Sequence, residues 1–352
     1  MSTFMIYGAN GYTGRLIARE AARRGMKPLL AGRSREGVAP LAAELGFALR
    51  VFDLTDGAQI ERNLDGVDLV LHCAGPFSQT AAPMLEACLA RKVHYLDITG
   101  EIDVFELCHH AGARARQQGI VVLPGSGFDV VPTDCLAAQL KRRMPAATSL
   151  VLAFEAGGGP SPGTAKTSVE GLGKGGRARI NGQVTTVPLG WKSRQFVRDD
   201  GKSRSAMTIP WGDVYTAYLS TGIPNIETYM VVPPKTIARM AWMRRLQPLL
   251  RFGFVQDFMK QRIERATPGP SEQRRQDSGC YVWGEATDAG GTQVRLALTA
   301  PNGYDLTVTA SLGIVERVRA QPPAGGGYFT PSQLMGADYV LSLPGVRLVE
   351  PA

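Results

Sequence analysis

The sequence lacks the features that would place it outside the ordinary globular proteins. Only 20% of its 352 residues are charged and 44% are hydrophobic. No block of like charge or low-complexity tract runs through it, which excludes disorder as the main state. A long apolar run is missing too, because basic residues interrupt the most apolar stretch, at 230–259. The first strand pattern starts at Phe4, so we expect no signal peptide and a soluble, cytoplasmic protein.

Metal-binding and disulfide patterns are scarce as well. The five cysteines include no CxxC pair, and the four histidines form no HExxH motif and join no cysteine at ligand spacing. We therefore expect reduced, mostly structural thiols and no metal site.

The net charge of +8 is unevenly distributed. Residues 141–275 hold 22 lysines and arginines against 9 acidic residues. Such an excess favours anionic partners: a phosphate-bearing substrate, an acidic carrier protein, an anionic membrane surface or nucleic acid. A solvated basic surface without a partner explains it equally well. No helix-turn-helix, zinc or aromatic-basic pattern is present, so we expect no nucleic-acid partner.

The order of apolar runs predicts two domains of different architecture. From Thr3 to Leu123, six short apolar runs alternate with helical patterns, which predicts an α/β fold with a Rossmann-type, doubly wound parallel sheet over residues 1–133. Later runs such as LVLAFEA, AMTIPWGDVYTAYL, ETYMVV and YDLTVTA are strand-like, and a hairpin is expected around Gly290. They predict a second, α+β domain at 134–328. Residues 234–265 favour two helices broken at Pro248, which either pack on the core or dock on a membrane surface or a partner.

A glycine-rich turn follows the first predicted strand. Gly8, Gly11 and Gly14 in MIYGANGYTGRLIARE have the GxxGxxG spacing and open a helix. Glycines at this place permit a tight turn, a close approach of the backbone to a pyrophosphate and helix packing on the strand. The phosphates then meet free N–H groups at the positive end of the helix dipole. The turn therefore predicts a dinucleotide site.

The second strand ends in Ala31-Gly32-Arg33-Ser34. An NAD site usually has an acidic residue here, whereas a guanidinium and a hydroxyl suit a 2′-phosphate. We therefore expect NADP(H) as the cofactor. Asp53, at the end of the third strand, is predicted either to contact the adenine amino group or to cap the next turn.

The remaining strand ends carry a ligand-facing loop and several acids. HCAGPFSQT follows the fourth strand, with Phe77 expected as a wall near the nicotinamide ribose. Asp97, Glu101, Asp129 and Asp134 follow the fifth and sixth strands. Acids at this edge cap helices, anchor loops or deliver a proton. Glu101 and Asp129 are the catalytic candidates. Short-chain dehydrogenase chemistry is excluded, since no tyrosine has a lysine four residues later.

The motifs GANGYTGR, AGRS, CAGPF, YLDITGE and GFDVVPTD, in this order, resemble the saccharopine dehydrogenase-like family of NAD(P)-dependent oxidoreductases. GGGPSPGTAKTSVEGL, YVWGEATDAGG, PNGYDLTV and GGGYFTPSQLMGADYVLSLPGV are similar to its trans-acting enoyl reductase branch. No lysine and histidine pair or arginine set of true saccharopine-cleaving enzymes can be placed, which argues against lysine metabolism.

The resemblance implies a C-terminal segment, 329–352, that returns to the Rossmann domain, and a set of binding residues. Those implied for the pyrophosphate are Gly8, Asn10, Gly11, Tyr12, Thr13 and Gly14; for the 2′-phosphate, Arg33 and Ser34; for the ribose and nicotinamide, Ala74, Gly75, Pro76, Phe77, Thr99 and Gly100; for the substrate, Phe128, Thr164 and Thr167.

The primary hypothesis is an NADPH-dependent enoyl reductase that transfers hydride to a polarised double bond of an acyl-type substrate, held on an acidic carrier protein or on coenzyme A. One alternative is an imine-reducing or amino-acid dehydrogenase. The other is a non-catalytic nucleotide-binding protein that docks on a lipid surface through residues 234–265. A homodimer is a further expectation.

Overall fold

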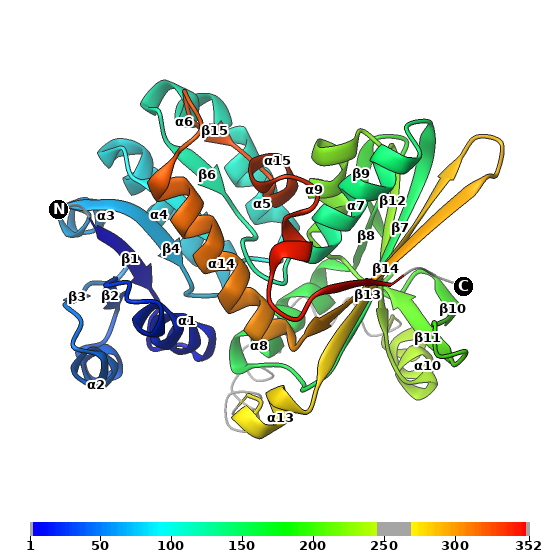
Figure 1. The fold of residues 1–352 in the computed structure, drawn as a ribbon, viewed down its shortest axis with the longest axis horizontal. Helices are drawn as coiled ribbons and strands as arrows, with labels where there is room; N and C mark the ends of the chain where they lie inside the picture. Colours follow the sequence, from blue (N-terminus) through cyan, green and yellow to red (C-terminus); the bar gives the residue numbers. More distant parts are fainter. Residues whose placement is uncertain (1–2, 245–268, 350–352) are drawn as a thin grey trace. The chain divides into compact units, whose positions relative to one another are not determined.

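The computed structural model describes residues 3–244 and 269–349, apart from some side chains in one helix. The chain divides into two units, each assembled from two stretches of sequence. The first comprises residues 1–131 and 304–335, and the second comprises residues 132–303 and 336–352 (Figure 1). Each unit is built on its own sheet.

The first unit contains a seven-stranded parallel sheet in the order β15-β6-β5-β4-β1-β2-β3. Its strands are β1 (Thr3–Tyr7), β2 (Leu29–Gly32), β3 (Leu49–Val51), β4 (Val67–His72), β5 (His94–Asp97), β6 (Val121–Leu123) and β15 (Gly327–Tyr328). The order of the first six is that of the predicted doubly wound sheet, and β15 adds a seventh strand from far along the chain. Strand order reverses between β1 and β4, so a ligand crevice is expected beyond their carboxyl ends.

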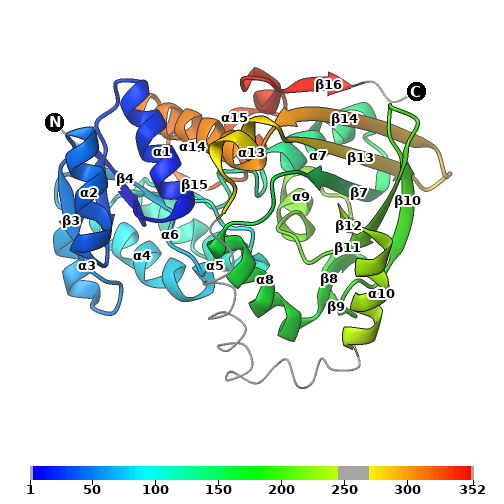
Figure 2. The same ribbon diagram turned by 90° about the horizontal axis from the view of Figure 1, so that it is seen from below.

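Helices cover both faces of this sheet. They are α1 (Tyr12–Arg23), α2 (Arg35–Leu45), α3 (Gly57–Asn63), α4 (Phe77–Arg91), α5 (Ile102–His110), α6 (Gly112–Gln118), α14 (Gly303–Ala320) and α15 (Pro331–Met335). Figure 2 shows α1 and α14 side by side on one face and α4 and α6 on the other. The core between α4, α5 and the sheet is fully buried around Met84, Cys88, Tyr95 and Cys108, so the thiols there are structural.

The second unit contains a nine-stranded mixed sheet. Seven strands follow the order β10-β11-β12-β7-β13-β14-β16, while β8 pairs with β12 and β9. The strands are β7 (Ala147–Ala156), β8 (Gly176–Ile180), β9 (Gln183–Val187), β10 (Ser193–Val197), β11 (Ser203–Thr208), β12 (Asn225–Val231), β13 (Gly279–Asp288), β14 (Gln293–Pro301) and β16 (Arg347–Val349). The helices are α7 (Val131–Arg143), α8 (Pro162–Lys174), α9 (Asp213–Thr221), α10 (Pro234–Met243), α13 (Glu272–Gln276) and the 3-10 helix η2 (Tyr339–Ser342). The hairpin expected around Gly290 is formed by β13 and β14. The sheet is mixed because β12 pairs with β7 in parallel.

Two segments expected as strands are helices. YDLTVTA lies in α14, and the DVYTAYL part of AMTIPWGDVYTAYL lies in α9. Threonine, valine and tyrosine favour strands only weakly, and tertiary packing overrides that preference. In α14, Leu306, Ala310 and Val318 are buried together with the other apolar residues of one broad face. The burial of that face determines the helix.

The division of the chain into two units also differs from the expected domain ranges. The return to the first unit begins at Tyr304 rather than at residue 329. Within the expected C-terminal segment 329–352, β16 pairs antiparallel with β14 of the second sheet. Of the two helices expected at 234–265, α10 is described and residues 245–265 lie outside the described part. None of the helices described is long and apolar enough to span a bilayer.

Candidate functional site

The glycine turn is closed too tightly for side chains. Gly8 has a φ of +82°, and a Cβ on it would lie 2.7 Å from the backbone nitrogen of Ala74. A Cβ on Gly14 would lie 2.3 Å from the carbonyl oxygen of Gly8. Glycine is therefore required at both positions. The contact with Ala74 also brings the loops after β1 and β4 together at the switch point.

The start of α1 is open where the neighbouring helices are capped. Within residues 3–244 and 269–349, no side chain caps α1 at Gly11 and no acid lies in its first turn. By contrast, Ser34 caps α2 and Asp56 caps α3. Free N–H groups at a helix start bind phosphate. The turn thus fits the pyrophosphate of a dinucleotide, and Tyr12 and Thr13 lie in its first helical turn.

The Asn10 side chain supports the adjoining turn between β2 and α2. A Cβ on Gly32 would lie 3.1 Å from Asn10 Oδ1, and one on Gly37 would lie 2.8 Å from Asn10 Nδ2. The absence of side chains at these two glycines therefore makes room for the amide. The expected role of Asn10 at the pyrophosphate stays a prediction.

The β2–α2 turn carries the residues expected at the 2′-phosphate. Arg33 is exposed. Ser34 Oγ accepts the Gly37 N–H at 3.2 Å and donates to Glu36 Oε2 at 2.7 Å. Burial raises the pKa of the Tyr7 hydroxyl to about 12, a rise that Asp53 reinforces and Arg33 opposes. Arg33 and Asp53 therefore both lie within electrostatic reach of the end of β1.

Asp53 has the turn-capping role that was one of its two expected roles. Its carboxylate accepts the Thr55 N–H at 2.8 Å and the Thr55 hydroxyl at 2.5 Å. These bonds lower the pKa of Asp53, so the residue stays ionised. Its contact with adenine remains a prediction.

The loop after β4 is fixed by contacts with Thr80 and His72. Thr80 Oγ1 donates to the Ala74 carbonyl at 2.6 Å and lies 3.0 Å from His72 Nε2. The Phe77 ring is only 8% exposed and packs edge-on against His72, 5.4 Å between centroids. The ring is largely part of the core, and its expected role as a wall of the ribose site stays a prediction. Gly75 and Pro76 form the exit from the strand, as expected.

Glu101 caps α4. Its two carboxylate oxygens accept the N–H groups of Phe77 and Ser78, both at 2.8 Å. Hydrogen bonds of this kind favour the charged form of a carboxyl, which opposes proton donation. The expected cap was for the helix that Glu101 precedes, α5, whereas the carboxylate caps α4 instead, and this geometry argues against the catalytic role.

Asp129 has a different environment. The residue lies between β6 and α7 and is half-buried, and desolvation raises the pKa of its carboxyl to about 7. A Cβ on Gly100 would lie 2.7 Å from Asp129 Oδ2. The loops after β5 and β6 thus place this carboxyl against bare backbone at the carboxyl edge of the sheet. A group with this pKa can both hold and release a proton at neutral pH.

Asp97 ties these two loops together, which is the loop-anchor role expected of acids at this edge. The fully buried carboxylate accepts the Thr99 N–H at 3.0 Å, the Gly125 N–H at 2.9 Å and the Tyr95 hydroxyl at 2.8 Å. Burial raises the pKa of Asp97 to about 6, against the effect of these bonds. Thr99 is itself buried, so it shapes the loop. The available sequence signal was an acid at the end of a buried strand.

Helix α14 contributes further residues that sequence reasoning missed. Thr307 Oγ1 accepts the Phe128 N–H at 2.9 Å, and Ser311 Oγ lies 3.2 Å from Ser126 Oγ. Tyr304 meets Tyr12 of the glycine turn edge-on, with ring centroids 4.9 Å apart. α14 therefore supports both the Asp129 loop and the start of α1. No local motif could reveal this, because about 180 residues separate α14 from the Asp129 loop and about 290 separate Tyr304 from Tyr12.

The other expected substrate residues are less informative. Phe128 is 9% exposed, which leaves little of its ring for a ligand. Thr164 is exposed in the first turn of α8, where its N–H donates to Ser161 Oγ at 3.2 Å. The side chain of Thr167 lies outside the described part. Asp134 Oδ1 accepts the Ser220 hydroxyl at 2.5 Å, a structural bond within the second unit.

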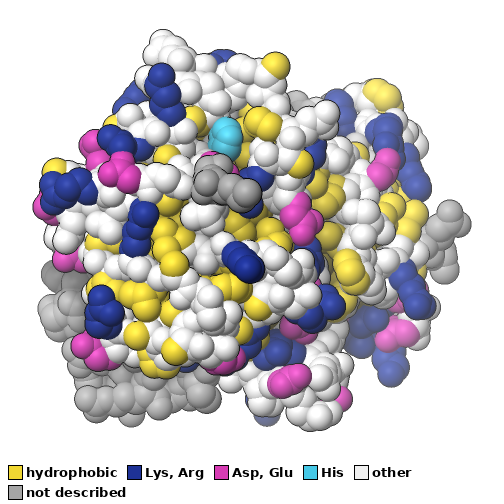
Figure 3. All heavy atoms as spheres, turned by 60° about the vertical axis from the view of Figure 1, so that its left-hand side comes forward, with side chains coloured by type: hydrophobic (Ala, Val, Ile, Leu, Met, Phe, Trp, Pro, Cys, Tyr) yellow, Lys and Arg dark blue, Asp and Glu magenta, His cyan; other side chains and the backbone are white. Residues whose placement is uncertain are grey.

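Part of the basic excess is neutralised by ion pairs on the second sheet. Basic residues in or next to β10 and β11 pair with acids of other strands. The pairs are Lys192–Glu227, Arg194–Glu285, Arg198–Glu155 and Arg204–Glu155. On the face drawn in Figure 3, basic and acidic side chains are also interspersed.

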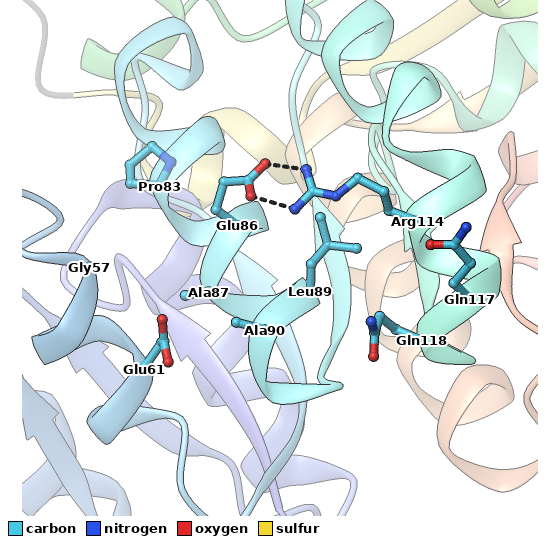
Figure 4. A pocket seen from close by; sticks show the side chains of 10 residues that line it. All are labelled: Gly57, Glu61, Pro83, Glu86, Ala87, Leu89, Ala90, Arg114, Gln117 and Gln118. Atoms are coloured by element: carbon cyan, nitrogen blue, oxygen red, sulfur yellow. Dashed lines mark hydrogen bonds and ion pairs between the residues drawn. The ribbon is translucent and has the colours of Figure 1, made fainter.

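A pocket over α3, α4 and α6 lies apart from the candidate residues. Its lining includes Glu61, Glu86, Arg114 and Gln117, and Glu86 and Arg114 form a two-bonded pair at 2.8 and 2.6 Å (Figure 4). These residues lie on helices and not at the carboxyl edge of the sheet, so the pocket is not part of the dinucleotide site.

Comparisons with known proteins agree with this geometry. Residues 4–123 match the family described as Saccharopine dehydrogenase NADP binding domain. The chain is 28% identical over 203 residues to the Saccharopine dehydrogenase-like oxidoreductase of Rattus norvegicus, which covers 50% of this chain and 47% of the relative. It is 32% identical over 151 residues to the Trans-acting enoyl reductase of Mycobacterium leprae (strain TN), covering 40% and 35%.

The fold extends further than these sequence matches. Saccharopine dehydrogenase (L-Glu forming) from Saccharomyces cerevisiae aligns with a TM-score of 0.68 at 11% identity, over 99% of this chain and 100% of that one. The matched region spans about half the length of the curated oxidoreductase relatives. Residues 4–123 therefore match a saccharopine dehydrogenase NADP binding domain, with NADP(H) as the cofactor, and about half of the chain is similar to the saccharopine dehydrogenase-like oxidoreductases.

Proposed function

We propose that this protein is an NADPH-dependent oxidoreductase that reduces a polarised carbon–carbon double bond of an acyl-type substrate. The observation that carries the proposal is Asp129, whose carboxyl has a pKa near 7 in the unit that binds NADP(H). Similarity to the trans-acting enoyl reductases of Mycobacterium leprae and Mycobacterium ulcerans supports the substrate class.

The chemistry divides between the cofactor and this carboxyl. NADPH, when bound, would supply hydride for the β-carbon of the double bond. The α-carbon then needs a proton, which Asp129 donates, and the half-buried carboxylate regains it from water. In sum, one NADPH and one proton saturate one double bond. Asp97 is a positioning residue, since it holds the two loops that present Asp129 and Gly100.

NADPH oxidation with an enoyl thioester, a cyclic imine and a ketone tests the proposal. We expect turnover with the enoyl thioester, a kcat lowered about 10²-fold to 10⁴-fold in Asp129→Asn, and an unchanged Kd for NADPH. Turnover with the imine alone would favour the imine or amino-acid dehydrogenase, and no turnover with any class would overturn the proposal.

The acyl group is proposed to arrive on an anionic carrier, a carrier protein or coenzyme A. The support is the excess of basic over acidic residues in 141–275. Two of these basic residues, Lys235 and Arg239 of α10, are exposed and form no ion pair with any described residue. A KM that is lowest for the carrier-bound substrate, and that rises steeply with salt, is the expected result.

A lipid surface is a second candidate partner. On α10, Trp242 is 59% exposed and no residue is buried. Basic residues with an exposed tryptophan are typical of interfacial helices. Co-sedimentation with anionic but not neutral vesicles, lost in Trp242→Ala, would support this candidate, and equal recovery with both vesicle types would exclude it.

A further inference from the structure

An acidic side chain occupies the turn where the extra phosphate of NADP(H) is expected. Glu36 lies in the first turn of α2, and its Oε2 accepts the Ser34 hydroxyl at 2.7 Å. The hydroxyl has a single proton to donate, and its oxygen already accepts the Gly37 N–H at 3.2 Å. A phosphate oxygen that takes the Ser34 proton must therefore displace Glu36.

Glu36 also opposes the phosphate by its charge. The hydrogen bond from Ser34 lowers the pKa of Glu36, so the carboxylate stays ionised at neutral pH. A 2′-phosphate beside it adds a second anion. The 2′-hydroxyl of NADH carries no charge and meets no such repulsion.

The displaced carboxylate has a cationic neighbour nearby. A groove is lined by Glu36 together with Asn10, Arg15, Arg19 and Glu44. Arg19 is already engaged, since Glu44 accepts two hydrogen bonds from it at 2.8 and 3.0 Å. Arg15 is exposed and forms no ion pair with any of the described residues.

We propose that Glu36 is a specificity-determining residue for the cofactor: its carboxylate leaves Ser34 for Arg15 when the 2′-phosphate binds, and it thereby weakens NADPH binding without weakening NADH binding. The proposal depends on the placement of the 2′-phosphate at Arg33 and Ser34. It does not depend on the proposed reaction, because its test measures binding alone.

Fluorescence titration with NADPH and NADH gives the test. Glu36→Gln is expected to tighten NADPH binding about three- to tenfold and to change NADH binding less than twofold. Glu44→Gln is the matched control, because it removes the same charge from the same groove, and it should alter the ratio of the two affinities less than twofold. Thermal melting of each variant checks that it folds.

A double-mutant cycle tests the Arg15 step. Arg15→Gln is expected to weaken NADPH binding about threefold in the wild-type chain and to have no effect in Glu36→Gln. An equal loss in both backgrounds would show that Arg15 binds the phosphate directly, which overturns this step.

Two further outcomes bear on the proposal as a whole. If Glu36→Gln shifts NADPH and NADH affinities equally, or weakens NADPH binding alone, Glu36 does not oppose the 2′-phosphate and the proposal fails. If Arg33→Ala leaves the preference for NADPH intact, the 2′-phosphate lies elsewhere and the proposal fails with it.

Discussion

Asp129→Asn is expected to stabilise the fold while it lowers kcat about 10²-fold to 10⁴-fold. The Asp129 carboxyl has a folded-state pKa of about 7 against an ordinary value of 3.8. The folded state therefore disfavours the charged form, and stability is lost as pH rises from about 4 to 7. The difference of about 3 pKa units corresponds to about 4 kcal/mol at pH 8, an upper bound because the half-buried residue keeps contact with water.

The stability of the wild type and of Asp129→Asn should therefore diverge with pH. We expect the variant to melt higher at pH 8, with a gain that shrinks by pH 5, because protonation already relieves the wild type there. Asp53→Asn is the opposite control. Hydrogen bonds from Thr55 lower the pKa of Asp53. The Asp53 carboxylate therefore stabilises the fold above its ordinary pKa and loses this stabilisation as pH falls. Asp53→Asn should lower the melting temperature at pH 8. A lower melting temperature of Asp129→Asn at pH 8, or a gain independent of pH, would refute the reasoning.

Three other substitutions test the supporting geometry. Gly14→Ala places a Cβ 2.3 Å from the Gly8 carbonyl oxygen, so NADPH binding should be lost in a fluorescence titration. Glu101→Gln removes a charged cap of α4; the free energy of unfolding should fall by about 1 kcal/mol while kcat changes less than tenfold, and a loss of 100-fold in kcat would make it catalytic. Tyr304→Ala should weaken NADPH binding about two- to fivefold because its ring supports Tyr12, whereas Tyr304→Phe should keep the wild-type Kd.

The first sheet could be predicted from the sequence because its signals are local. The glycine turn, the caps at Ser34 and Asp56 and the alternation of strand and helix each depend on residues close in the chain. α14 and α9 could not be predicted in this way. Their threonines, valines and tyrosines have weak strand propensity, and only burial against partners far along the chain determines the helix.

The same distinction applies to the candidate site. Gly8 and Gly14 have conformational requirements that a motif expresses, and the structure gives them the expected geometry. The sequence gives Glu101 and Asp129 equal standing, since both are acids after a buried strand. What separates them is whether backbone N–H groups satisfy the carboxylate, as at Glu101, or burial leaves it unfavourable, as at Asp129. Neither condition is visible in the spacing of residues.

The loop that carries Asp129 is held from two directions, and this explains how an unfavourable carboxyl persists. The Gly125 N–H donates to Asp97, while the Phe128 N–H donates to Thr307 of α14. Such bonds contribute about 0.5 to 1.5 kcal/mol each, or about 1.5 to 3 kcal/mol when the acceptor is charged. Together they are comparable to the penalty of desolvating Asp129. A loop anchored in this way cannot expose its acid fully to water. An acid that lowers the stability of the fold at such a firmly held position is typical of a functional group, because functional sites keep residues that reduce stability.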